Sequence, residues 1–188
     1  MTTIVGIAGS LRRGSFNHAL LRAAAEMAPA GATIEIASIR EIPLYDGDVE
    51  ALGIPPAVAQ LKERIARADG LLLVTPEYNG SIPGVFKNAI DWLSRPASDI
   101  PRVFGGRPTA LAGATPGPNR TSSSQAAWLP ILRALGVRAW FGPRMGIGGA
   151  GKVFDHDGRL VDETVREQLR AFVAGFVAFA DSGKGSQG

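Results

Sequence analysis

Short runs of apolar residues alternate with longer amphipathic stretches along most of the chain. Compact apolar runs bounded by turn residues are typical of buried strands, whereas apolar residues at helical spacing indicate helices packed on one side. The pattern predicts strands over residues 4–8, 33–39, 71–75, 109–114 and 137–141. It predicts helices over residues 16–28, 55–68, 83–93, 125–135 and 162–180.

Regular strand–helix alternation implies an α/β fold in which helices cover both faces of a parallel sheet. Five strands favour a flavodoxin-like three-layer α/β/α sandwich of strand order 2-1-3-4-5 over the dinucleotide-binding order, which usually has six strands. We assign residues 1–181 to a single domain. The Gly-, Ser- and Lys-containing residues 182–188 are expected to form a flexible C-terminal tail.

Composition narrows the possible chemistry. The 188 residues include no cysteine, which excludes disulfides, thiolate metal sites and a cysteine nucleophile, so redox chemistry would need a bound cofactor. His18 and His156 are too far apart to suggest a metal site. The net charge of +3 comes without a basic run, and no apolar run approaches the ~20 residues of a membrane span. We therefore expect a cytoplasmic protein with no nucleic-acid or membrane partner.

The loop after the first predicted strand, residues 9–17, combines a strand-ending Gly9 with hydroxyls, the guanidinium groups of Arg12 and Arg13, and Asn17. Backbone N–H groups at a helix start, the positive end of the helix dipole and these donors together form an anion site. Ser15 suits the N-cap position. A capped helix with two solvated arginines explains the residues about equally well. The glycines lack Gly-x-Gly-x-x-Gly spacing, which argues against dinucleotide binding.

Two further loops follow the third and fourth predicted strands. Residues 75–84 place Glu77, Tyr78 and Asn79 between prolines and glycines, which suits a planar heteroaromatic ring that needs edge contacts and an aromatic face. A strand-to-helix turn would explain the prolines but not these three residues. Residues 114–125 could close over a ligand or form a plain polar connection.

Together these segments resemble the NADPH-dependent FMN reductase family. The resemblance rests on residues 9–12 with Ser15 and Asn17, on residues 76–84, and on residues 87–92, and it extends in order over essentially the whole chain. The family has a flavodoxin-like fold and includes quinone, chromate and azo-compound reductases.

The resemblance implies an FMN site built from all three loops. In the first loop it places the phosphate, with Ser10, Arg12, Ser15 and Asn17 as contacts beside Gly9, Leu11 and Phe16. In the second it frames the isoalloxazine with Pro76, Glu77, Tyr78, Asn79 and Ser81. In the third it adds Thr115, Pro116 and Gly117. Many members carry a glycine pair and Arg-x-Gln where this chain has Asn119 to Gln125, which leaves acceptor choice and nicotinamide preference open.

We therefore expect an FMN-dependent enzyme that oxidises NADPH or NADH and reduces quinones, with chromate, azo compounds or free flavin as further acceptors. No catalytic side chain or metal is required, because N5 of the flavin carries the chemistry. One pocket for donor and acceptor predicts ping-pong kinetics, and the resemblance suggests a homodimer or homotetramer. The alternatives are a flavodoxin-type electron carrier, which the net charge of +3 disfavours, and a flavin-binding accessory protein.

Residues 146–152 match the first seven positions of a phosphate-binding P-loop. Val153 lacks the hydroxyl that would bind magnesium, and residues 154–158 indicate a turn rather than a helix. We interpret this stretch as a flexible segment near the flavin site or as a subunit contact.

Overall fold

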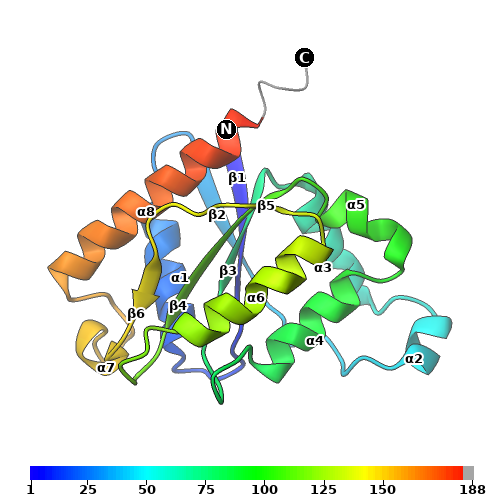
Figure 1. Cartoon of the computed structure of the whole chain (residues 1–188), viewed down its shortest axis with the longest axis horizontal. Helices are drawn as coiled ribbons and strands as arrows, with labels where there is room; N and C mark the ends of the chain where they lie inside the picture. Colours follow the sequence, from blue (N-terminus) through cyan, green and yellow to red (C-terminus); the bar gives the residue numbers. More distant parts are fainter. Residues whose placement is uncertain (184–188) are drawn as a thin grey trace.

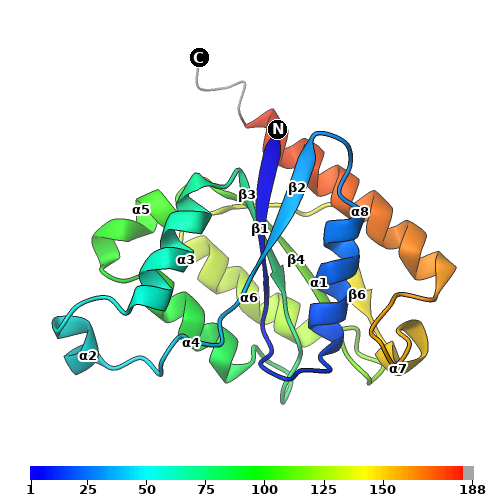
Figure 2. The same cartoon turned by 180° about the vertical axis from the view of Figure 1, so that it is seen from behind.

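A parallel sheet forms the centre of the computed structural model, which describes residues 1–183 (Figures 1 and 2). Its strand order is β2-β1-β3-β4-β5, and β6 pairs with β4. The bounds are β1 (Thr2–Ala8), β2 (Ala32–Ala37), β3 (Gly70–Val74), β4 (Pro108–Ala114), β5 (Arg138–Ala139) and β6 (Met145–Ile147). The predicted order 2-1-3-4-5 is confirmed, with one strand more than expected.

Helices cover both faces of this sheet (Figures 1 and 2). The helices α1 (Phe16–Glu26) and α8 (Glu163–Ser182) pack on one face, and α3 (Pro56–Arg67), α4 (Gly84–Leu93) and α6 (Ser122–Ala134) pack on the other. The predicted flavodoxin-like three-layer sandwich is therefore confirmed. Within residues 1–183, no helix is both long enough and apolar enough to cross a membrane.

The continuous apolar run of β3 follows from burial on both faces. All five of its residues are buried. Because side chains alternate along a strand, Leu72 and Val74 pack with α1 and α8, whereas Leu71 and Leu73 pack with α3, α4 and α6. A strand covered on both sides has no polar positions, and this is the pattern from which it was predicted.

The fifth predicted strand, residues 137–141, was too long, and the expected total of five strands was wrong. The chain pairs with β4 only at Arg138 and Ala139, then leaves the sheet and resumes pairing as β6. Pro143 lies in the excursion and has no N–H group to donate to a ladder. The Trp140 ring turns onto Phe172, with ring centroids 5.1 Å apart. Side-chain packing therefore interrupts the strand.

Four short elements carry no periodic signal and were not predicted: α2 (Gly47–Ala51), the 3₁₀ helix η1 (Ala97–Asp99), α5 (Ile100–Val103) and α7 (Ala150–Val153). Elements of three to five residues are too short for helical periodicity to appear. Of the expected tail, residues 182–188, Ser182 is the last residue of α8 and Gly183 is its cap. The rest of that tail, residues 184–188, lies outside the described residues.

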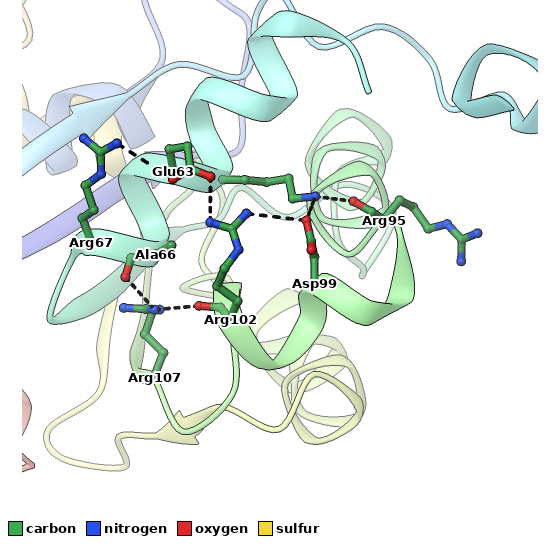
Figure 3. A network of polar contacts seen from close by, with 8 residues as sticks. Glu63, Ala66, Arg67, Arg95, Asp99, Arg102 and Arg107 are labelled. Carbon is green, nitrogen blue, oxygen red and sulfur yellow. Dashed lines mark hydrogen bonds and ion pairs between the residues drawn. The ribbon is translucent and has the colours of Figure 1, made fainter. Parts of the chain in front are cut away.

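A network of ion pairs joins α3 to the η1–α5 segment (Figure 3). The buried Lys62 binds Asp99, and this hydrogen bond holds the pKa of the Asp99 carboxyl below its ordinary value. Arg102 pairs with Glu63 at 2.7 Å. Arg107 donates to backbone carbonyls of both segments immediately before β4 begins. The network thus lies at the amino ends of the strands, away from the three loops, and its role is structural.

Candidate active site

The three loops singled out in the sequence meet at the carboxyl ends of β1, β3 and β4. The N–H of Gly9 donates to Val74 O at 2.9 Å, and the N–H of Thr75 donates to Ala112 O at 2.8 Å. A Cβ atom on Gly9 would lie 2.0 Å from the Phe86 ring, so no side chain fits there. The loops enclose a cavity of about 340 Å³, within the size range of small-ligand pockets.

Most residues predicted for the site line this cavity. Its wall contains Ser10, Arg12, Ser15, Phe16, Asn17, Pro76, Glu77, Tyr78, Thr115 and Pro116, together with Ala114, which was not predicted. Five predicted residues lie outside the wall: Gly9, Leu11, Asn79, Ser81 and Gly117. Their contacts with a cofactor remain predictions.

The first loop has the donors of an anion site. Ser15 caps α1, and its Oγ accepts the N–H of Asn17 at 3.2 Å. Among residues 1–183, the N–H groups of Ser10 and Phe16 donate to no protein group. The guanidinium of Arg12 lies 5.6 Å from the centroid of the Phe16 ring and has no carboxylate partner in the described chain. A free cation and free N–H groups thus converge on the start of a helix.

Two side chains that sequence reasoning missed hold this loop from outside. A ring nitrogen of His18 forms a hydrogen bond with Ser10 O at 2.7 Å. Nη2 of Arg40 donates to Leu11 O. Arg40 follows β2, and only the pairing of β2 with β1 brings it near the loop. No local sequence signal could have found this contact.

Asn17 connects the first loop to β4. Its Nδ2 donates to Ala114 O at 2.8 Å, and its Oδ1 accepts the N–H of Ala114 at 2.9 Å. The side chain is buried, and these bonds use both its donor group and its acceptor group. Asn17 was predicted to contact a phosphate, and that contact remains a prediction. The geometry assigns the amide a positioning role, because it fixes the start of α1 against the end of β4.

The tip of the second loop is a tight hairpin. Tyr78 and Ser81 exchange backbone hydrogen bonds of 3.1 and 3.0 Å, and the two residues between them, Asn79 and Gly80, have φ angles of 50° and 71°. Asn-Gly is the preferred pair for such a type I′ turn. Asn79 and Ser81 do not line the cavity, while Tyr78, 52% exposed, forms part of its wall.

Glu77 connects the second loop to α6. Its Oε2 accepts the N–H of Ser123 at 2.9 Å and that of Ser124 at 3.2 Å. Thr121, which precedes the helix, has a left-handed φ of 54° and makes no capping bond with its side chain. The Glu77 carboxylate therefore caps α6 from another loop and places a negative charge at the positive end of the helix dipole.

Replacing Glu77 should first weaken this cap. We expect Glu77→Ala to lower the free energy of unfolding of the apoprotein by about 1 kcal/mol, the usual contribution of a cap, and Glu77→Gln to lower it less because an amide oxygen can still accept. Urea unfolding measures both values. Unchanged stability in both variants, combined with loss of FMN affinity, would instead show that the carboxylate contacts the ligand.

The third loop packs against the segment that resembles a P-loop. The N–H of Thr115 donates to Ile147 O at 2.9 Å, and the N–H of Gly149 donates to Gly117 O at 3.1 Å. A Cβ atom on Gly146 would lie 2.3 Å from Arg120 O, so the glycine allows close contact between the two segments. The segment expected to be flexible is thus β6 followed by the helical turn α7, and it supports the third loop.

The fold and the cavity together define a flavodoxin-like protein with a mononucleotide-sized site. The donor chemistry of the cavity fits FMN: Arg12 and the free N–H groups suit the phosphate, and Tyr78 offers an aromatic face for the ring.

Comparisons with known proteins agree with this class. Residues 2–150 match the model of the NADPH-dependent FMN reductase family. An NAD(P)H-dependent FMN reductase of Pseudomonas aeruginosa is 46% identical over 167 residues, 89% of each chain. A quinone reductase of Pseudomonas putida is 39% identical over 177 residues, 94% of each chain. The structure of FerB, a flavoenzyme NAD(P)H:(acceptor) oxidoreductase from Paracoccus denitrificans, superposes with a TM-score of 0.87 at 33% identity, covering 97% of this chain and 98% of that one. The chain belongs to the NADPH-dependent FMN reductase family.

Proposed function

We propose that residues 1–181 form one FMN-binding domain that catalyses electron transfer from NADPH or NADH to a quinone. The observation that carries the proposal is the single cavity that joins the anion site at Arg12 to the aromatic rim at Tyr78. The quinone reductase among the relatives supports the acceptor class. Chromate, azo compounds and free flavin are alternative acceptors. An electron carrier is not favoured, because the relatives are named as reductases.

In this proposal the role of the side chains is to bind FMN and to orient it. FMN, when bound, supplies the electron-transfer chemistry, so no acid–base pair is needed. Arg12, Ser10 and Ser15 hold the phosphate, and Tyr78 and Pro116 bound the ring. The N–H of Glu77, which donates to no group within residues 1–183, is available to the ring edge. Because the fold already holds this N–H in place, it would stabilise negative charge at the ring edge without any rearrangement of the protein.

Donor and acceptor are expected to use the same opening beside Tyr78 in turn. Initial rates measured with NADPH and 1,4-benzoquinone should therefore give parallel double-reciprocal lines, as in a ping-pong reaction. The flavin released by heat denaturation should be FMN rather than FAD. Lines that converge would mean that both substrates bind together, and this would contradict a shared opening.

We also propose that the chain works as a homodimer or homotetramer. Leu44, which precedes α2, is 80% exposed, and Leu52, which directly follows it, is 92% exposed. Exposed apolar side chains of this size suit a contact between protein chains.

A further inference from the structure

A second cavity, of about 420 Å³, lies at the edge of the sheet where β5 is interrupted. Thr109 of β4 pairs with Ala139, and Ala112 pairs with Met145, so five residues, 140–144, lie opposite only two residues of β4. The intervening residues 140–144 line this cavity together with residues of α6. Gly142 allows this segment to fold tightly over Trp140, since a Cβ atom there would lie 2.1 Å from the Trp140 ring.

The walls of this cavity are mainly apolar, with a few polar side chains among them. The apolar lining includes Leu111, Leu129, Leu132, Phe141 and Phe172. The polar lining comprises Thr109 of β4, Ser122 and Gln125 of α6, and Arg144. An apolar pocket with a few converging polar groups is the usual form of a small-molecule site.

Arg144 determines which charge this site would accept. Its Nη2 donates to Ser122 Oγ at 2.7 Å, which holds the guanidinium at the cavity rim. Within residues 1–183 it has no carboxylate partner. A guanidinium has five N–H donors, so most of them stay available to a ligand. The side-chain N–H groups of Gln125 are not available to a ligand, because Nε2 already donates to Thr121 Oγ1 and to Met145 O.

We propose that this cavity is a binding site for an amphiphilic organic anion. A carboxylate or sulfonate pairs with Arg144, and an aromatic or aliphatic body packs against Leu129 and Phe141. The site is separate from the cavity of the first three loops and shares no lining residue with it. The two cavities are adjacent at the start of α6. Ser122 lines the second cavity, and the next two residues donate their N–H groups to Glu77, which lines the first.

Calorimetric titration of the FMN-loaded protein with naphthalene-2-carboxylate and its uncharged carboxamide tests the proposal. Arg144→Gln should weaken carboxylate binding at least tenfold, the effect of one charge-assisted hydrogen bond, and leave carboxamide binding nearly unchanged. Ala126→Phe, which fills the cavity from α6, should weaken both. The control is Arg133→Gln, which removes an exposed arginine of α6 outside the cavity and should change neither.

Equal carboxylate affinity in Arg144→Gln and in Arg133→Gln would overturn the proposal, and so would unchanged binding of both ligands in Ala126→Phe. Sedimentation velocity of the same variants provides an independent check. A smaller assembly in Ala126→Phe would show that a second copy of the chain covers this cavity, and this too would overturn the ligand site. An unchanged assembly with weakened binding supports it.

Discussion

Removing both Arg12 and Ser15 side-chain donors should reduce FMN affinity by about 10²- to 10⁴-fold. Each charge-assisted hydrogen bond to a phosphate contributes about 1.5–3 kcal/mol, and two such losses add up to that range. The measurement is the dissociation constant of FMN from the apoprotein of Arg12→Ala/Ser15→Ala, followed by quenching of flavin fluorescence.

Two controls separate phosphate binding from damage to α1. Arg13→Ala removes a neighbouring exposed arginine that does not line the FMN cavity, and it should leave the affinity within about threefold. Riboflavin, which has no phosphate, should bind the double variant and the parent protein equally. If riboflavin affinity falls as far as FMN affinity, the loss of the Ser15 cap, and not the loss of phosphate contacts, is responsible.

Asn17→Leu should lower the free energy of unfolding by about 2–6 kcal/mol. The substitution keeps the size of the side chain but leaves the buried N–H and C=O of Ala114 without their partner, at about 1–3 kcal/mol for each group. That loss is a large fraction of the 5–15 kcal/mol that stabilises a typical domain. Urea unfolding of the apoprotein measures it.

Asn119→Leu is the matched control, because Asn119 is exposed in the third loop and its side chain makes no hydrogen bond within residues 1–183. It should change stability by no more than about 0.5 kcal/mol. If Asn17→Leu were equally mild but lost FMN, the Asn17 amide would be a ligand contact, as the family resemblance suggested.

The local pattern was sufficient where an element is long and buried. The five residues of β3 are all buried, and the amphipathic α1 and α3 begin within one residue of their predicted starts. Prediction failed where packing at a distance decides the backbone. The interruption after Ala139 depends on the contact of Trp140 with Phe172, more than thirty residues away, which no local window can contain.

In the candidate site, too, local features were predictable and contacts between distant residues were not. The first loop was predicted from its own residues, because a glycine, hydroxyls and arginines before a helix identify an anion site wherever they occur. The Asn-Gly pair in the second loop also carried a local signal for a hairpin turn, and that turn moves Asn79 out of the cavity wall. The capping of α6 by Glu77 could not be foreseen, because its partners lie 46 and 47 positions further along the chain.

The sequence by itself determined the layered α/β fold, the three loops and the need for a bound cofactor, because hydrophobic periodicity, turn residues and the absence of cysteine are local or compositional facts. Only the tertiary structure decided which polar groups remain free for a ligand. Asn17 and Glu77 bond to backbone groups of distant elements, whereas Arg12 and Arg144 have no carboxylate partner within residues 1–183. The physical reason is that a side chain binds a ligand only when the folded chain leaves its hydrogen-bonding groups unsatisfied.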